Sequence, residues 1–254
     1  MESTGKIALV TGGSRGLGKN MALRLAEKGN DVIVVYRSKE QEATEVVGAI
    51  EALGQKAVAV QLDTANVKSF EDFFSKLSGI LREKWNRTSF DFLVNNAGIS
   101  RPSAFHETSE EDFDDLLNVH FKGVYFLSQK ALPLLADGGR IVNLSTGLAR
   151  FSMPGFAAYA SMKGAIDTLT RYMAKELGGR GITVNALAPG AIYTDFNSDS
   201  FDSHAGLTDF ISSITALGRV GEPNDIGGVV AFLCSEDARW ITGQRIEVSG
   251  GMFL

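Results

Sequence analysis

Two residues four positions apart, Tyr159 and Lys163, are the side chains of this sequence best suited to acid–base chemistry. Their segment is rich in Ala and Met, and residues four apart share one face of a helix. Free tyrosine titrates near pH ~10, and a neighbouring ammonium group lowers that pKa because it favours the phenolate. The spacing predicts an acid, Tyr159, tuned by Lys163. The alternative for this pair alone is an ordinary helix with a surface lysine and a half-buried tyrosine.

A glycine-rich stretch, Thr11-Gly-Gly-Ser-Arg-Gly-Leu-Gly18, stands between a strand-like apolar run and a helix-forming segment. In that order the three glycines suit a phosphate cradle: Gly12 permits a tight turn, Gly16 lets the backbone approach a pyrophosphate, and Gly18 lets the helix pack on the strand. The stretch therefore predicts a dinucleotide site, with a simple turn as the alternative.

The next β-branched run ends at Tyr36, with Arg37 after it, where a dinucleotide-binding fold recognises the adenosine ribose. An acidic residue there would bind a free ribose hydroxyl. Arg37, with Arg15 of the glycine stretch, instead suits a 2′-phosphate. The pattern favours NADP(H) over NAD; the alternative is that both arginines are solvated surface residues.

Strand-like and helical patterns alternate along the whole chain and must position these residues. They predict one α/β domain over 1–254, a Rossmann-type doubly wound parallel sheet of about seven strands with helices on both faces. A capping-box signature at 108–111 predicts one long helix to about Leu132. The irregular segment 195–215 is expected to be a mobile substrate loop, or a lid with its own small core; its ring side chains are Phe196, Phe201, His204 and Phe210.

Composition excludes several classes of function. The net charge is −5 with no basic run, which argues against nucleic acid as a partner. No signal peptide and no apolar stretch of about 18 residues is evident, so we expect a soluble cytoplasmic protein without a membrane partner. The single cysteine, Cys234, lies in an apolar helical pattern and is expected to be buried and inert. The three histidines have no metal-ligand spacing, so no metal is predicted.

Taken together, these motifs resemble the classical short-chain dehydrogenase/reductase family from Lys6 to Leu254, with a pattern close to 3-oxoacyl-[acyl carrier protein] reductases. Four motifs in family order carry the resemblance: TGGSRGLG at 11–18, NNAG at 95–98, the Tyr159-x-x-x-Lys163 pair, and Pro189-Gly190 with Thr194. Any one of them is a weak signal, but four with the right spacing support one another.

The resemblance implies roles for individual residues. Tyr159 would protonate the carbonyl oxygen during reduction, and Lys163 would depress its pKa and hold the nicotinamide ribose. Asp63 and Thr64 would border the adenine, and the segment 95–98 would line the cofactor ribose. Ile192 and Thr194 would hold the carboxamide. The implied cofactor-binding residues are Gly12, Ser14, Arg15, Gly16, Leu17, Gly18, Tyr36, Arg37, Asp63, Thr64, Asn95, Ala97, Gly98, Tyr159, Lys163, Pro189, Gly190, Ile192 and Thr194.

Two positions depart from the family pattern. Thr146 stands where the family usually has the serine that polarises the carbonyl, and Ser145 precedes it. Because neighbours on a strand point to opposite faces, only one should reach the site, and the register favours Thr146. His120 stands where the family usually has an asparagine that holds a relay water. It has three possible roles: a structural histidine, a proton relay with a near-neutral pKa, or a direct substrate contact.

The leading hypothesis is an NADPH-dependent reductase of a ketone or aldehyde, with Tyr159, Lys163, Thr146 and His120 as the catalytic set. A second enzymatic hypothesis is an alcohol or sugar dehydrogenase working oxidatively. A hypothesis of another class is a non-catalytic NADP-binding sensor or scaffold, which would need the glycine stretch but not the acid–base pair. The resemblance also implies a homotetramer, or a homodimer, formed through the two longest helices and the last strand.

Overall fold

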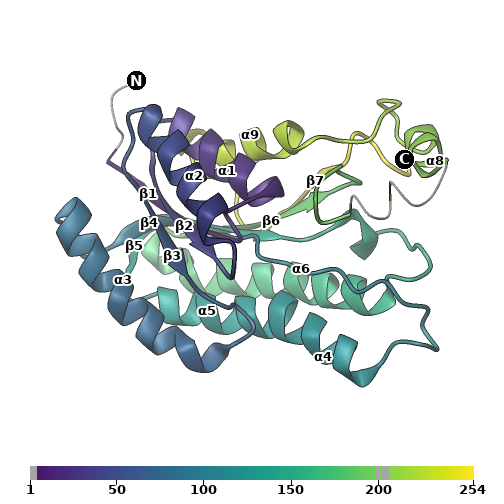
Figure 1. The fold of residues 1–254 in the computed structure, drawn as a ribbon, viewed down its shortest axis with the longest axis horizontal. Helices are drawn as coiled ribbons and strands as arrows, with labels where there is room; N and C mark the ends of the chain where they lie inside the picture. The colour runs from purple at the N-terminus through teal and green to yellow at the C-terminus, as the bar shows by residue number, and fades with distance from the viewer. Residues whose placement is uncertain (1–4, 198–200, 202–205) are drawn as a thin grey trace.

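The computed structural model describes residues 5–197, 201 and 206–254. Within them, one seven-stranded parallel sheet has the strand order β3-β2-β1-β4-β5-β6-β7, the doubly wound arrangement of dinucleotide-binding folds (Figure 1). This confirms the predicted fold class. The strands are β1 (Ile7–Thr11), β2 (Asp31–Tyr36), β3 (Ala57–Gln61), β4 (Phe90–Asn95), β5 (Leu135–Leu144), β6 (Thr183–Pro189) and β7 (Arg245–Val248).

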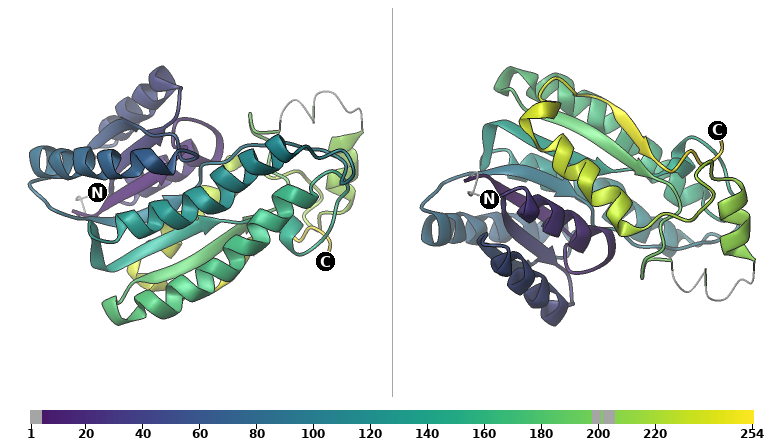
Figure 2. Two further views of the ribbon diagram at one scale, coloured as in Figure 1. Left: turned by 90° about the horizontal axis from the view of Figure 1, so that it is seen from below. Right: turned by 90° about the horizontal axis from the view of Figure 1, so that it is seen from above.

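Helices cover both faces of the sheet, and each face has its own apolar core (Figure 2). Strands β1, β2 and β4 are buried along their whole length, as expected for parallel strands between two helical layers. One layer contains α1 (Gly16–Glu27), α2 (Glu40–Ala52) and α9 (Pro223–Leu233); the other contains α3 (Phe70–Trp85), α4 (Glu110–Leu117), α5 (Val124–Ala131) and α6 (Ala157–Leu177). The other described helices are α8 (Leu207–Ser213), short 3-10 helices at Val67–Ser69, Gly147–Ala149, Gly178–Arg180 and Glu236–Ala238, and a π-helical segment at Asn118–Gly123.

The long helix expected from 108 to 132 is interrupted. A π-helical segment, Asn118–Gly123, separates α4 from α5 and contains His120, which is buried. The extra residue of a π-turn leaves no mark on a 3.6-residue apolar pattern over so short a stretch, so the sequence did not reveal it. The helix also begins one residue later than predicted, because Ser109, not Thr108, accepts the capping hydrogen bond, from the N–H of Asp112 at 3.1 Å.

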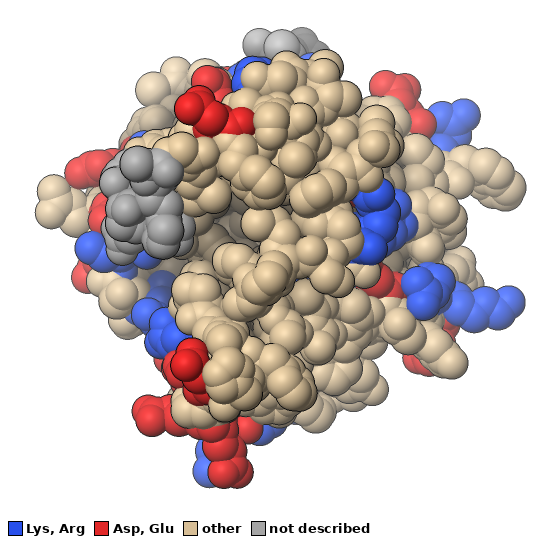
Figure 3. Space-filling model, turned by 90° about the vertical axis from the view of Figure 1, so that its right-hand side faces the viewer, with Lys and Arg blue, Asp and Glu red and all other residues tan. Residues whose placement is uncertain are grey.

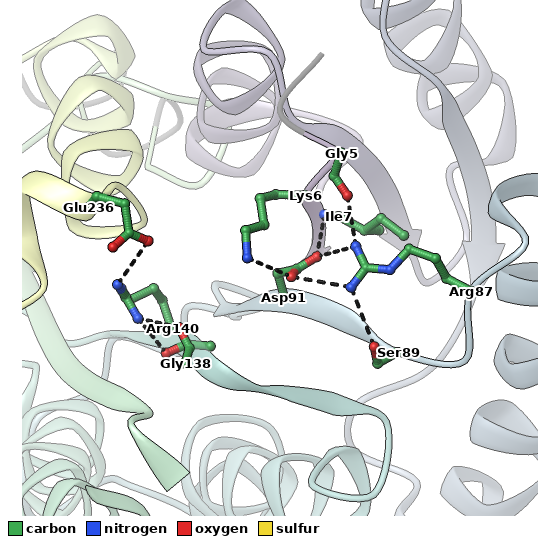
Figure 4. A network of polar contacts seen from close by, with 10 residues as sticks. Gly5, Lys6, Ile7, Arg87, Ser89, Asp91, Gly138, Arg140 and Glu236 are labelled. Atoms are coloured by element: carbon green, nitrogen blue, oxygen red, sulfur yellow. Dashed lines mark hydrogen bonds and ion pairs between the residues drawn. The ribbon is translucent and has the colours of Figure 1, made fainter.

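The amino-terminal edge of the sheet is fastened by an ionic network centred on Asp91 (Figure 4). Its buried carboxylate accepts hydrogen bonds from the Ile7 N–H at 2.8 Å, Lys6 Nζ at 3.2 Å and Arg87 Nη1 at 2.7 Å. These contacts tie β1 to β4 at the end opposite the glycine loop. Charges at this edge are therefore structural, which leaves the carboxyl edge of the strands for chemistry.

No helix among the described residues has the length and apolarity needed to cross a membrane.

Candidate active site

Tyr159 and Lys163 occupy the first two turns of α6, one turn apart as their spacing predicts. Lys163 is almost fully buried, and its Nζ lies 5.7 Å from the centre of the Tyr159 ring. The same ammonium donates a hydrogen bond of 2.6 Å to the carbonyl oxygen of Leu144, the last residue of β5. The lysine is thereby anchored to the sheet and positioned over the face of the tyrosine ring.

Thr146 follows β5 and is the hydroxyl that meets Tyr159. Its side chain acts on the Tyr159 phenol, whose pKa it lowers, and its Oγ1 accepts a hydrogen bond from the N–H of Leu148 at 3.3 Å. Ser145 is buried, and its hydroxyl has no hydrogen-bond partner among the described residues. The structure thus brings together Thr146, Tyr159 and Lys163, in the register that the strand alternation favoured.

The pKa values at this cluster are governed by burial. Burial raises the pKa of Tyr159 to about 12, and the hydrogen bond from Thr146 acts in the opposite direction. Burial lowers the pKa of Lys163 to about 8, opposed by the carboxylate of Asp167. Burial therefore outweighs the lowering of the Tyr159 pKa that was expected from Lys163, whose ammonium lies over the ring and donates to the Leu144 carbonyl.

His120 extends this cluster from the π-helical segment. Its ring stands edge-on to Tyr159, with centroids 5.0 Å apart and an interplanar angle of 90°. Burial and the charge of Lys163 lower the pKa of His120 to about 3. The relay hypothesis assumed a near-neutral pKa, and that premise was wrong: the site holds this imidazole neutral throughout the physiological range.

The glycine loop has the shape that a pyrophosphate requires. A Cβ on Gly18 would lie 2.0 Å from the carbonyl oxygen of Gly12, so only glycine lets α1 pack this closely. Gly12 and Gly16 both have positive φ, at 62° and 52°. Arg15 precedes α1 without a side-chain cap, so the first N–H groups of the helix are available to an anion. Ser14 and Leu17 lie in the same turn, and the residues present fit a dinucleotide phosphate.

Two residues of this region were missed by the sequence analysis, Thr11 and Asn96. Thr11 Oγ1 accepts from the N–H groups of Asn96 at 2.9 Å and Ala97 at 3.0 Å. The Asn96 side chain in turn donates to the carbonyl oxygens of Thr11 and Gly12, at 2.8 and 3.1 Å. Together they fix the glycine loop against the segment that follows β4.

The side chain of Asn95, one of the residues predicted to line the cofactor, is engaged inside the protein. Its amide donates to Ser128 Oγ at 3.0 Å and to Asn143 Oδ1 at 2.8 Å, inside the packing between β4, β5 and α5. Neighbours on a strand face opposite ways, so when Asn95 is directed toward α5, Asn96 is directed toward the glycine loop. That alternation was a signal available in the sequence.

The other predicted cofactor residues lie along the same carboxyl edge. Tyr36 is buried at the end of β2 and Arg37 follows it exposed. Asp63 forms a turn by accepting from the Ala65 N–H at 3.0 Å. The carbonyl oxygen of Thr64 would be 2.3 Å from a Cβ placed on Gly123, so the π-helical segment packs tightly on this loop.

The segment after β6 approaches the glycine loop from the far side. A Cβ on Gly190 would lie 2.9 Å from Ser249, and one on Gly16 would lie 3.7 Å from the Thr194 side chain. Asn197 closes this turn, because its side chain accepts from the Thr194 N–H at 3.1 Å and donates to the Ile192 carbonyl at 2.9 Å. Thr194 therefore lies beside the glycine loop, on a turn with Ile192, and Pro189 and Gly190 precede this turn at the end of β6.

The described part of the 195–215 segment places one aromatic side chain at the acid–base cluster. The ring centre of Phe196 is 6.3 Å from that of Tyr159, and Phe196 is 43% exposed. Phe201 contacts Tyr193 instead, with centroids 5.4 Å apart, and Phe210 lies on α8. His204 lies outside the described residues.

Figure 3 shows that the face seen from the α8 end consists mostly of uncharged residues. No cluster of metal-ligating side chains occurs in the described part of the chain.

Comparison with known proteins agrees with this geometry. The sequence model of the family described as "Enoyl-(Acyl carrier protein) reductase" matches residues 12–253. The chain is 40% identical to the 3-oxoacyl-[acyl-carrier-protein] reductase FabG of Staphylococcus aureus, over 98% of both chains. The angucycline C-6 ketoreductase LanV, solved with bound NADP, is 40% identical with a TM-score of 0.93, over 98% of this chain and 96% of that one. The promiscuous reductase LugOII, which catalyses a keto-reduction in lugdunomycin biosynthesis, is 38% identical with a TM-score of 0.93 over 100% of both chains. The chain belongs to the short-chain dehydrogenase/reductase family.

Proposed function

We propose that the protein is an NADPH-dependent reductase of a ketone carbonyl. The observation that carries the proposal is the cluster of Thr146, Tyr159 and Lys163, with the lysine one helical turn from the tyrosine, beside a glycine loop shaped for a dinucleotide. A 3-oxoacyl-[acyl-carrier-protein] reductase and an angucycline C-6 ketoreductase are among the similar proteins, and the latter was solved with NADP, which supports both the reaction and the cofactor.

The chemistry follows from the protonation state of Tyr159. When bound, the reduced nicotinamide would supply the hydride. A phenol with a pKa of about 12 is protonated at neutral pH, so it can donate its proton to the developing alkoxide. The Thr146 hydroxyl would donate a second hydrogen bond to the same oxygen. Oxidation of an alcohol would need the phenolate instead, which burial disfavours, so the geometry supports reduction over the oxidative alternative.

The cofactor contacts of the chain follow from the same edge of the sheet. The glycine loop and the amino-terminal N–H groups of α1 would hold the pyrophosphate, and Arg37 with Arg15 would hold the 2′-phosphate. The guanidinium of Arg15 lies 3.9 Å from the carboxylate of Asp195. Because exposed ion pairs are weak, a phosphate could take the place of that carboxylate at little cost. Lys163 would hold the nicotinamide ribose.

We infer an apolar, ring-containing substrate from Phe196, which is partly exposed and adjoins Tyr159. The test is NADPH oxidation with a panel of matched ketones: aromatic bicyclic ketones, cyclohexanones and 3-oxoacyl thioesters. The proposal predicts turnover of at least one class, with aromatic ketones preferred. Binding of NADPH without oxidation across the panel would contradict it and would favour the sensor hypothesis.

Self-association through α5, α6 and the chain end is part of the proposal. Tyr125 on α5 is 42% exposed, Tyr172 on α6 is 65% exposed and Leu254 is 97% exposed. Apolar side chains at these places suit a contact between copies of the chain. Sedimentation would give a homotetramer or a homodimer, and a monomer would remove this part of the proposal. The cytoplasmic location stays a prediction.

A further inference from the structure

His120 contacts two parts of the site at once. Its Nε2 lies 2.8 Å from the carbonyl oxygen and 3.2 Å from the amide nitrogen of Ile99, the residue that follows the Asn95–Gly98 motif. Its ring packs edge-on against Tyr159. A Cβ on Gly98 would lie 2.9 Å from His120 Cε1, so glycine at that position is what admits the imidazole. One side chain therefore sets the separation between this loop and the proton donor.

The hydrogen bonds of Ile99 indicate which tautomer is present. A neutral imidazole has one N–H and one acceptor nitrogen. Ile99 makes two contacts with Nε2: its backbone N–H is directed at Nε2 over 3.2 Å, as toward an acceptor, and its carbonyl oxygen lies 2.8 Å away, as toward a donor. We assign the hydrogen to Nε2 because the contact with the carbonyl oxygen is the shorter of the two. Nδ1 is then an acceptor; it is buried and has no partner among the described residues.

We propose that His120 is a positioning residue of the reductase, which donates its Nε2 hydrogen to Ile99 and packs against Tyr159, so that the loop and the acid keep a fixed separation. The proposal rests on the proposed function. It differs from a proton relay, because the hydrogen on Nε2 stays bonded to a backbone carbonyl throughout turnover. The histidine that stands here in place of the family's usual asparagine would therefore hold the site's geometry rather than transfer a proton.

The proposal is tested by two variants with a matched control. His120→Phe keeps a ring against Tyr159 but removes the donor, so kcat should fall by about 10- to 100-fold, the size expected for a misplaced acid. NADPH affinity and ketone KM should change less than about threefold. His120→Gln places an amide N–H where Nε2 stood and should recover kcat to within about fivefold of wild type. His106→Gln, at a side chain that is 80% exposed, is the control and should behave as wild type.

A second readout does not depend on turnover. Ring ¹⁵N NMR of the wild-type protein, assigned by loss of the signals in His120→Gln, should show a neutral Nε2–H tautomer from pH 5 to 8. The Nδ1–H tautomer, or protonation within that range, would overturn the proposal, as would an active wild type whose kcat is unchanged in His120→Phe. Absence of turnover in the wild type would instead reject the proposed function, and the NMR result would still decide the geometry of His120.

Discussion

The ammonium group of Lys163 lies over the Tyr159 ring, 5.7 Å from the centre of that ring. Burial nevertheless governs the phenol and raises the pKa of Tyr159 to about 12. The two residues are therefore arranged to keep a proton on the acid until a carbonyl oxygen takes it. A protonated Tyr159 suits the role of proton donor in the reduction of a carbonyl.

The hydroxyl of Thr146 should matter more than that of its neighbour. Thr146→Val removes the donor to the carbonyl oxygen at nearly constant volume, and kcat should fall by about 10²- to 10³-fold, the usual loss for one such donor. Thr146→Ser keeps the hydroxyl and should stay within about tenfold of wild type. Ser145→Ala is the control, since its hydroxyl has no partner among the described residues. Steady-state kinetics decide the matter, and a larger loss in Ser145→Ala would reverse the assignment.

Preference for NADPH should depend on Arg37. Arg37→Ala removes a charge-assisted hydrogen bond to the 2′-phosphate, typically worth about 1.5–3 kcal/mol, so the Kd of NADPH should rise by about 10- to 100-fold. The Kd of NADH, which lacks that phosphate, should stay nearly constant. Fluorescence titration of both cofactors measures this, with Arg171→Ala on the exposed side of α6 as control. Equal weakening for NADPH and NADH would contradict recognition of the phosphate.

Two glycine-to-alanine substitutions should have opposite effects. Gly18→Ala would place a Cβ 2.0 Å from the Gly12 carbonyl oxygen, so it should displace α1, lower Tm and weaken cofactor binding. Gly48→Ala is its matched control, because Gly48 lies inside α2 with nothing within 4 Å of the added Cβ. That change should stabilise the protein by about 0.5–1 kcal/mol. Thermal unfolding with and without NADPH tests both predictions. A Gly18→Ala protein with unchanged Tm and unchanged stabilisation by NADPH would contradict the phosphate-binding role of the glycine loop.

Acid should destabilise the protein partly through His120. Its pKa in the folded protein is about 3, whereas an unfolded histidine titrates near ~6.5. Below ~6.5 the unfolded chain binds the extra proton, so the free energy of unfolding contributed by this group falls as the pH decreases toward 3. Urea unfolding at pH 7, 6, 5 and 4 should show a steeper loss in wild type than in His120→Gln. Parallel curves for the two proteins would contradict a buried, neutral histidine.

Much of the fold and of the site was readable from the sequence. The glycine stretch, the β-branched runs and the spacing of Tyr159 and Lys163 each follow from local rules, and they predicted the sheet, the phosphate loop and the helical pair. Strand alternation also selected Thr146 over Ser145. The same alternation, applied to Asn95 and Asn96, would have identified the residue that faces the glycine loop.

The remainder depended on three-dimensional packing. The π-helical segment around His120 packs closely on the loop at Thr64 through Gly123, a contact between distant parts of the chain that the apolar periodicity does not report. The pKa values of Tyr159 and His120 depend on how deeply each is buried, and burial at a site comes from several strands and helices at once. Residue types alone therefore suggested a lowered tyrosine pKa and a near-neutral histidine, and both were wrong.

The central claim is that Tyr159 donates the proton, and Tyr159→Phe tests it most directly. The change removes one oxygen and keeps the ring that packs against His120 and Phe196. Tyr172→Phe on the same helix is the matched control, because it removes only an exposed hydroxyl and keeps the ring that we propose for contact between copies of the chain. With a ketone that the wild type reduces, kcat for NADPH oxidation should fall by about 10²- to 10⁴-fold in Tyr159→Phe, with NADPH affinity retained, and should be unchanged in Tyr172→Phe. Turnover by Tyr159→Phe within a few-fold of wild type would contradict the account.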